Sequence, residues 1–268
     1  MTALQPPTIL IVDGVEQERK TYRQYLLEDT NDTYTILEAK SGADGLAICR
    51  SHPVDGVLLN YCLPDGDGLQ FLSTLTQHCL QACPPVILVA DQGNETIAVR
   101  AIKSGAEDYL VKRHLTPDAL RCTLQTAIEN AKLRRQIQNS EERFYTSVET
   151  MLDCYGIYTA IRNESGEIED FRVEYVNAAA CENNQLTKEQ QIGKRLCEIL
   201  PAHRQSGLFA EYCQLVETGI PLVKNSLIYA DQYGQHYLSK AFDIRATKLG
   251  DGFVASWRDV TVQMRILL

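Results

Sequence analysis

The chain has 268 residues, of which 44% are hydrophobic and 23% are charged, and its formal net charge is −9. At roughly 100–200 residues per domain this length predicts two domains, and the acidic balance argues against nucleic acid as a partner. The longest apolar runs are strand-sized, so we expect no membrane segment. The N-terminal sequence MTALQPPTIL does not resemble a signal peptide, which favours a cytoplasmic protein.

The nine cysteines are odd in number and irregularly spaced, which indicates reduced thiols rather than a disulfide framework. His78, Cys79 and Cys83 lie close together in the sequence. A second pair of ligands is missing from the sequence, so we expect small apolar helix positions and no metal site.

Apolar runs alternate with amphipathic segments over roughly the first 120 residues, which is typical of a parallel sheet covered by helices. The predicted strands are 9–12, 34–38, 56–60, 86–90 and 108–111, and the predicted helices are 16–28, 43–51, 68–80 and 95–104. The pattern predicts an α/β domain with a doubly wound, five-stranded parallel sheet.

A fifth helix is predicted to begin at Thr116-Pro117, where an N-cap residue precedes proline at the first helical position. The following sequence contains neither glycine nor a further proline as far as Leu152. Either one continuous helix runs to Leu152, or two helices meet near Asn139-Ser140. We interpret residues 131–152 as a helical linker that pairs in a dimer.

From Gly156 the pattern changes to two strands, several short helices and three longer strands, which predicts an α+β domain with a five-stranded antiparallel sheet. The predicted strands are 157–161, 171–176, 222–230, 236–247 and 252–258, and the predicted helices are 177–184, 187–191 and 203–217.

Four segments of the first half carry a specific resemblance: ILIVD at 9–13, LLNYCLPDGDG at 58–68, PVILVA at 85–90 and SGAEDYLVK at 104–112. Together they resemble the receiver domain of two-component response regulators. The resemblance implies a flavodoxin-like domain over residues 1–130, with its site at the carboxyl ends of the strands.

In that family the first strand ends in an acidic pair, the third in a phospho-accepting Asp, the fourth in Thr or Ser, and the fifth in Lys. At the matching positions stand Asp13 and Gly14 (acidic pair), Asn60 (phospho-acceptor), Ala90 (Thr or Ser), Lys112 (Lys) and Tyr109 (aromatic switch). The resemblance therefore implies that Gly14, Asn60 and Ala90 lack the groups that bind Mg²⁺ and the phosphoryl oxygens.

We interpret this domain as a phosphorylation-independent pseudo-receiver in which Mg²⁺ binding is weak or absent. In this hypothesis Lys112 pairs with Asp13 and holds the pocket in one state. Asp65 and Asp67 belong to the next turn and helix start, where Asp is favoured for capping. The alternative is an atypical receiver that is still phosphorylated.

Residues 153–268 resemble a PAS domain through EYVNAA at 174–179, IGKR at 192–195 and the triplet Asp259-Val260-Thr261. The resemblance implies that Asp259 and Thr261 pass signals to a following helix. The candidate pocket residues are Phe242, Ile244, Phe253 and Trp257, although alternating strand positions are more often plain core. Neither Cys197 nor His203 stands in a recognisable flavin or haem motif, so we predict no cofactor.

Together, the two resemblances predict a two-component signalling module that acts through contacts with a histidine kinase or output domains. We expect a homodimer through the linker or the helices that flank the PAS domain. No catalytic domain is recognisable in the sequence. The alternative is the N-terminal regulatory part of a sensor histidine kinase whose catalytic domains lie outside this chain.

Overall fold

The computed structural model describes residues 6–28, 34–78, 83–91, 95–233 and 236–262. It divides into two compact units, Met1–Ser140 and Glu141–Leu268. Each unit has its own sheet and its own hydrophobic core.

The first unit is built on five parallel strands in the order β2-β1-β3-β6-β7. They are β1 (Thr8–Val12), β2 (Thr35–Ala39), β3 (Gly56–Asn60), β6 (Val86–Ala90) and β7 (Asp108–Val111). Every residue of β3 and β6 is buried, because helices cover both faces of the sheet. This arrangement confirms the predicted flavodoxin-like fold.

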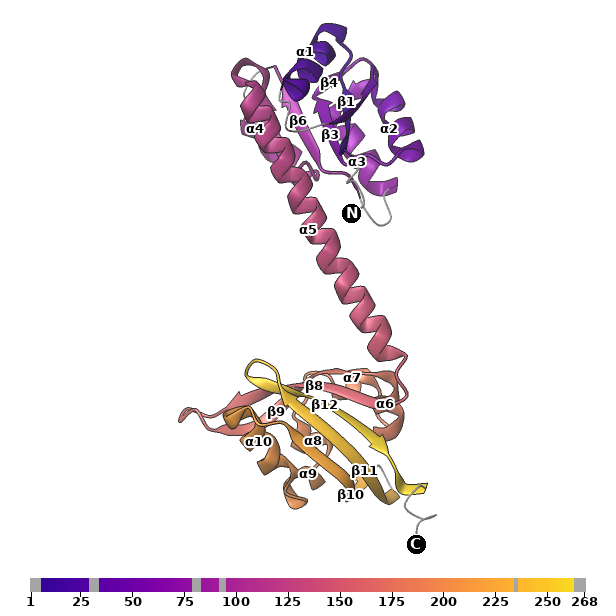
Figure 1. Cartoon of the computed structure of the whole chain (residues 1–268), viewed down its shortest axis with the longest axis vertical. Helices are drawn as coiled ribbons and strands as arrows, with labels where there is room; N and C mark the ends of the chain where they lie inside the picture. Colours follow the sequence, from indigo (N-terminus) through magenta and orange to yellow (C-terminus); the bar gives the residue numbers. More distant parts are fainter. Residues whose placement is uncertain (1–5, 29–33, 79–82, 92–94, 234–235, 263–268) are drawn as a thin grey trace. The chain divides into compact units, whose positions relative to one another are not determined.

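Helices pack on both faces of this sheet (Figure 1). They are α1 (Glu16–Leu27), α2 (Gly42–Ser51), α3 (Gly68–His78), α4 (Glu95–Lys103) and α5 (Pro117–Glu149). On one face Leu26 of α1 and Leu124 of α5 share a core with Ile87, and on the other Phe71 and Ala101 pack with Leu88. A short hairpin, β4 (Cys62–Leu63) with β5 (Gly66–Asp67), and the 3₁₀ turn η1 (Lys112–His114) were not predicted.

Helix α5 is continuous from Pro117 to Glu149, so the alternative break near Asn139-Ser140 does not occur. The Thr116 hydroxyl accepts a hydrogen bond from the Ala119 amide at 3.2 Å, which is the predicted N-cap. The absence of glycine and proline from its interior removes the residues that most often end a helix.

The second unit holds five antiparallel strands in the order β10-β11-β12-β8-β9. The strands are β8 (Cys154–Arg162), β9 (Ile168–Val176), β10 (Leu222–Tyr233), β11 (His236–Lys248) and β12 (Gly252–Asp259). The helices are α6 (Ala178–Asn184), α7 (Lys188–Gln191), α8 (Leu196–Ile199), α9 (Ala202–Gln205) and α10 (Leu208–Thr218).

The helix predicted over 203–217 is two helices, because Gly207 between α9 and α10 has a left-handed backbone with φ of 81°. Helix α8 is a further short helix that the sequence pattern did not predict.

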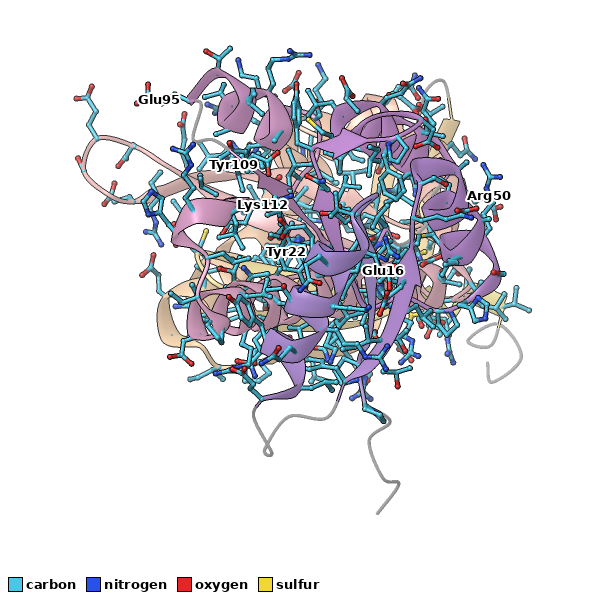
Figure 2. The ribbon with its side chains drawn as sticks, turned by 90° about the horizontal axis from the view of Figure 1, so that it is seen from above. Glu16, Tyr22, Arg50, Glu95, Tyr109 and Lys112 are labelled. Atoms are coloured by element: carbon cyan, nitrogen blue, oxygen red, sulfur yellow. The ribbon has the colours of Figure 1, made fainter. Side chains whose placement is uncertain are left out.

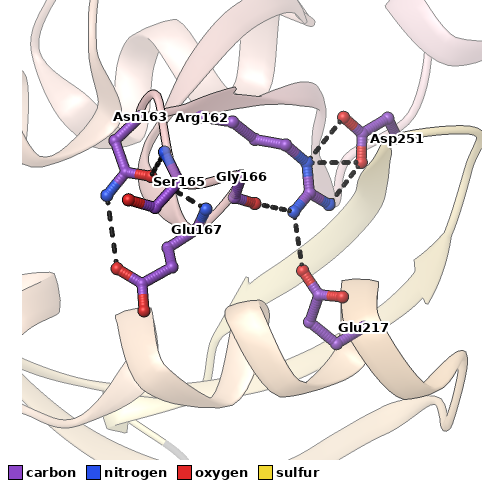
Figure 3. Close-up of polar contacts among 7 residues, drawn as sticks. All are labelled: Arg162, Asn163, Ser165, Gly166, Glu167, Glu217 and Asp251. Carbon is purple, nitrogen blue, oxygen red and sulfur yellow. Dashed lines mark hydrogen bonds and ion pairs between the residues drawn. The ribbon is translucent and has the colours of Figure 1, made fainter.

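Arg162 joins three segments at one end of this sheet (Figure 3). Its guanidinium donates to Asp251 at 2.6 Å, to Glu217 of α10 at 2.9 Å and to the carbonyl oxygen of Gly166 at 2.7 Å. The neighbouring Asn163 side chain closes the β8–β9 turn by accepting the amide hydrogens of Ser165 and Glu167. These bonds hold two hairpin turns against α10, namely the β8–β9 turn and the β11–β12 turn that contains Asp251.

Within the described ranges, no helix has both the length and the apolar character that are needed to cross a bilayer. None of the cysteines in those ranges is joined to another by a disulfide. Cys79, which belongs to the sequence cluster near His78, lies outside the described residues.

Candidate functional site

The polar residues at the strand ends of the first unit meet at one edge of the sheet. Asn60 is the last residue of β3 and pairs with Val89, and Ala90 is the last residue of β6 and pairs with Val111. Asp13 directly follows β1, and Lys112 directly follows β7. Parallel strands place their carboxyl ends together, which is where this fold holds its site.

Lys112 is surrounded by three carboxylates. Its ammonium lies 3.6 Å from Oδ2 of Asp13, 3.7 Å from Oε1 of Glu18 and 3.0 Å from Oδ1 of Asp91. The Asp13 side chain is 1% exposed and that of Lys112 is 13% exposed. Glu18 on α1 and Asp91 after β6 were not predicted as site residues, because neither stands at a position that the resemblance assigns.

These charges keep Lys112 protonated. Burial lowers the pKa of this lysine, but the hydrogen bond with Asp91 and the charges of Asp13 and Glu18 outweigh burial, so the pKa is raised. The ammonium is therefore held in its charged form by the protein's own carboxylates.

The main chain around Asp13 is fixed by further contacts. Oδ1 of Asp13 accepts the amide hydrogen of Val15 at 2.8 Å, and its carbonyl oxygen accepts from Nη1 of Arg19 at 2.8 Å. Arg19 and Arg23 both pair with Glu38, at 3.2 and 3.1 Å. The carboxylate of Asp13 is thus oriented by α1 as well as by Lys112.

Three polar atoms in this unit are buried without a hydrogen-bond partner among the described residues: Oδ2 of Asp13, Oδ1 of Asn60 and the hydroxyl of Tyr22. The pKa of Tyr22 is raised, first by burial and then by the charges of Glu18, Asp13 and Asp91. Figure 2 marks Tyr22, Lys112 and Tyr109, which come from α1, η1 and β7. Tyr22 was not predicted as a site residue.

The residues at this edge do not fit the Mg²⁺ ion that the receiver family implies. Asp13 is the one carboxylate at the predicted ligand positions, Gly14 has no side-chain oxygen, and the amide of Asn60 carries no charge. The ammonium of Lys112 already lies beside the free oxygen of Asp13.

Gly14 is also closed off by its neighbour. A Cβ atom on Gly14 would lie 2.6 Å from Cγ and 2.9 Å from Cδ of Pro64. An acidic side chain at this position therefore requires the Pro64 ring to move. Ala90 is 3% exposed and has no hydroxyl to offer a phosphoryl oxygen.

Tyr109 is partly buried and packs against the core on the face covered by α2, α3 and α4. This position lies two residues before the end of β7. The resemblance assigns it the role of an aromatic switch, and that role stays a prediction.

The two aspartates after β3 act as caps, but on different helices. Asp67 accepts the amide hydrogen of Gln70 in α3 at 2.8 Å, as predicted. Asp65 instead accepts the amide hydrogens of Gly42 and Ala43 in α2, both at 2.9 Å, which lower its pKa although burial raises it slightly. The sequence places Asp65 beside α3 and does not indicate this contact with α2.

The second unit contains a cavity of about 40 Å³, enough for a few water molecules. Its lining consists of Tyr158, Asn183, Asn184, Leu196, Leu200, His203, Leu208, Tyr212, Tyr229, Phe242, Ile244 and Trp257. Three of the four predicted pocket residues, Phe242, Ile244 and Trp257, line it.

Phe253 does not line the cavity, so that prediction was wrong. Its ring is 0% exposed and stacks against Tyr158 and Tyr212, with ring centroids 4.8 and 4.2 Å apart. The strand pattern gave Phe253 the correct inward direction, but aromatic neighbours from β8 and α10 fill the space around it.

A buried polar pair lies in the cavity wall and was not predicted. The hydroxyl of Tyr229 lies 2.7 Å from Nδ1 of His203, and both residues are buried. His203 lies in α9 rather than in a loop, and its Nδ1 is also 3.2 Å from the carbonyl oxygen of Leu200. The two residues are 26 positions apart in the chain, so no sequence pattern indicates this contact.

Cys197 is half-buried. Its amide donates to Oδ1 of Asp170 at 3.2 Å, and burial raises the pKa of its thiol to about 12. The neighbouring Leu196 lines the cavity.

The predicted output residues form a tight turn at the end of β12. Oδ1 of Asp259 accepts from the amide of Thr261 at 2.9 Å and from its hydroxyl at 2.5 Å. The hydroxyl of Thr261 in turn accepts the amide hydrogen of Ala241 in β11 at 2.9 Å.

Comparisons with known proteins match the first unit. The family model of the response regulator receiver domain matches residues 9–125. The transcriptional regulatory protein SrrA of Staphylococcus aureus is 33% identical over 104 residues, which is 39% of this chain and 41% of SrrA. The match thus spans less than half the length of that relative.

Solved structures that resemble part of this chain include two receiver domain proteins. A response regulator receiver domain protein from Clostridium thermocellum is 27% identical and covers 47% of this chain and 98% of its own, with a TM-score of 0.42. A CheY-like receiver domain protein from Methanospirillum hungatei is 21% identical and covers 48% and 99%, with a TM-score of 0.43. From the family match and the observed sheet, residues 9–125 are a response regulator receiver domain of the two-component type.

Proposed function

We propose that the receiver domain of this chain does not accept a phosphoryl group, and that it signals together with a PAS-type sensor domain in residues 153–268. The two domains act through protein contacts rather than through chemistry. Histidine kinases and output domains of two-component systems are the expected partners.

The observation that carries the first part is the environment of Lys112. In a phosphorylatable receiver the corresponding lysine is the cation that holds the phosphoryl group. Here the ammonium already lies among Asp13, Glu18 and Asp91. This ion-pair cluster supports a pocket that keeps one state without a phosphoryl group.

The remaining positions support the same proposal. Phosphoryl transfer to the protein needs a carboxylate nucleophile at the end of β3, and the amide of Asn60 is a poor nucleophile. Ala90 and Gly14 lack the hydroxyl and the carboxylate that would stabilise the transferred group.

The proposal that residues 153–268 form a PAS-type sensor domain is supported by the architecture of the second unit. Its order of two strands, short helices and three strands agrees with the PAS resemblance, and its sheet is antiparallel and five-stranded. It also contains a small cavity lined by both apolar and polar side chains, which is a candidate position for a sensed molecule.

A homodimer through α5 is the third part of the proposal. Leu133 and Ile137 are four residues apart on one side of the helix and are 57% and 60% exposed. Apolar side chains at this spacing are buried when two helices pair. A second copy of the chain is therefore the expected partner for this side of α5.

Phosphorylation is tested with the full chain, acetyl phosphate and Mg²⁺, followed by intact-mass measurement. We expect no phosphorylated species and no change on adding beryllofluoride. The triple variant Gly14→Asp, Asn60→Asp, Ala90→Thr is the matched positive control, with Asn60→Asp alone beside it because Asp at position 14 must displace Pro64. A phosphorylated wild-type chain would contradict the proposal and favour the atypical receiver.

Native mass spectrometry of the full chain tests the proposed homodimer and the proposed sensor function. We expect a dimer that dissociates in the variant Leu133→Glu, Ile137→Glu, while Leu27→Glu, at a leucine of α1 that is 50% exposed, leaves it intact. Added mass that disappears on denaturation would identify a ligand for the cavity. A monomeric wild-type chain would rule out the dimer.

A further inference from the structure

We propose that Lys240 couples the wall of the cavity in the second unit to the turn at Asp259-Thr261. The proposal rests on the sensor function proposed above. It adds the side-chain contacts through which a change in the cavity would alter the turn after β12. It concerns a positioning residue, since Lys240 does not line the cavity itself.

Lys240 bridges α6 and β12. Its ammonium donates to Oδ1 of Asn183, at the end of α6, at 3.1 Å, and lies 3.3 Å from Oδ2 of Asp259, at the end of β12. The lysine side chain is 25% exposed and that of Asp259 is 37% exposed. A partly buried ammonium between an amide oxygen and a carboxylate holds both acceptors more firmly than an exposed one would.

On one side the bridge leads into the cavity wall. Asn183 and Asn184 both line the cavity, and Nδ2 of Asn183 donates to Oδ1 of Asn184 at 3.3 Å. Asn184 is buried and donates onward to Oε1 of the buried Gln191 at 2.8 Å. A buried amide network of this kind is sensitive to any molecule that competes for its hydrogen bonds.

On the other side the bridge leads to the output turn. Asp259 uses Oδ2 for Lys240 and Oδ1 for the amide and hydroxyl of Thr261. The backbone next to Lys240 is tied to the same turn, because the Ala241 amide donates to Thr261 and the Ala241 carbonyl accepts from the Val260 amide at 2.8 Å. Lys240 and Ala241 therefore hold the turn from two directions.

Asn183 and Asp259 therefore share the ammonium group of Lys240 as their common partner. If a ligand draws the side chain of Asn183 away, Lys240 loses one acceptor and shifts toward Asp259. This shift alters the geometry of the carboxylate that orders Thr261. A change at the cavity thus becomes a change in the order of the residues that follow β12.

The test is hydrogen exchange of the Thr261 and Ala241 amides in the full-length protein. Lys240→Met keeps the length of the side chain and removes its charge, and we expect both amides to exchange about two- to five-fold faster, as for loss of a partly exposed ion pair. Lys240→Arg should restore most of the protection. The matched control is Lys224→Met, which removes a lysine of β10 that pairs with Glu211 and contacts neither the cavity nor the turn.

The coupling itself is tested with Asn183→Ala, a residue that does not contact Thr261 directly. We expect this variant to speed exchange at Thr261 in the wild-type background and to have no further effect in the Lys240→Met background. An Asn183→Ala effect that is absent, or that simply adds to that of Lys240→Met, would overturn the proposal. The same holds if Lys224→Met accelerates exchange equally.

These measurements need no ligand, so they separate the coupling from the sensor function. Native mass spectrometry that finds no bound molecule would contradict the sensor function alone. Exchange rates that are unchanged by Lys240→Met would contradict the coupling alone. Fluorescence of Trp257, the single tryptophan of the chain, verifies that each variant is folded.

Discussion

The ammonium of Lys112 and the carboxylate of Asp13 lie 3.6 Å apart at the carboxyl edge of the receiver sheet. The two residues are 99 positions apart in the chain, and both side chains are largely buried. Because a buried carboxylate is costly without a compensating charge, this pair should stabilise the domain in its present state.

We expect Lys112→Met to lower the free energy of unfolding of the receiver by about 2–3 kcal/mol, less than for a fully buried pair because Asp91 is 65% exposed. Adding Asp13→Asn to Lys112→Met should reduce this loss of unfolding free energy by about 1–2 kcal/mol, because the carboxylate that Lys112 neutralises is then absent as well. Hydrogen exchange of the β1 and β3 amides measures this unit alone. Lys103→Met, at an exposed lysine of α4, is the control, and strictly additive effects of the two substitutions would contradict the ion pair.

The same pair predicts how receiver stability depends on alkaline pH. The pKa of Lys112 is raised by folding above its ordinary value of 10.5, so its contribution is fully present below pH 10.5 and is lost as the pH rises through the folded-state pKa. The buried Tyr22, whose pKa is also raised, adds a loss in the same direction. The effect of Lys112 is therefore measured as the difference in the free energy of unfolding between the wild type and Lys112→Met. This difference should become smaller above pH 10.5.

Asp65 should contribute to stability through the N-terminus of α2. We expect Asp65→Ala to cost about 1 kcal/mol, because two amide hydrogens of α2 lose their acceptor. The pKa of Asp65 is lowered from 3.8, so this contribution is present above pH 3.8 and is lost as the pH falls through the lower, folded-state pKa. Urea unfolding followed by circular dichroism measures the difference, with Asp44→Ala in the first turn of α2 as the control. An equal cost for both substitutions would contradict the capping role.

Gly252 should tolerate no side chain. A Cβ atom at this position would lie 2.0 Å from the carbonyl oxygen of Tyr158 on the neighbouring strand β8. We expect Gly252→Ala to cost about 3 kcal/mol, because backbone atoms must move to relieve the contact. Gly250→Ala, where nothing lies within 4 Å of the added atom and φ is 57°, should cost only about 1 kcal/mol from backbone strain. Urea unfolding followed by Trp257 fluorescence reports this unit, and equal losses would argue against the steric explanation.

The alternation of strands and helices in the first half was predictable, because a strand covered on both faces must be continuously apolar and each parallel connection needs a helix. The position of Lys112 near Asp13 was expected from the resemblance to receiver domains, which assigns both residues to strand ends at the same edge of the sheet. The partners Glu18, Asp91 and Tyr22 were not, because they come from helix and loop positions whose direction depends on packing.

In the second unit the inward direction of Phe253 and Trp257 followed from strand alternation, but which of them borders a cavity did not. A cavity is the space that neighbouring side chains leave unfilled, and the residues that line this one come from eight different helices and strands. The contact of His203 with Tyr229 and the bridge made by Lys240 arise in the same way, from residues that are distant in the chain.

Periodicity and local residue type were therefore enough to predict the two five-stranded sheets and the polar residues at the strand ends. They left open whether α5 is one helix or two, and the structure shows one continuous helix. Three contacts came from the fold of the whole domain: the three carboxylates around Lys112, the capping of α2 by Asp65, and the position of Lys240 between Asn183 and Asp259. These contacts depend on the packing direction of individual side chains, which a local pattern of residues does not specify.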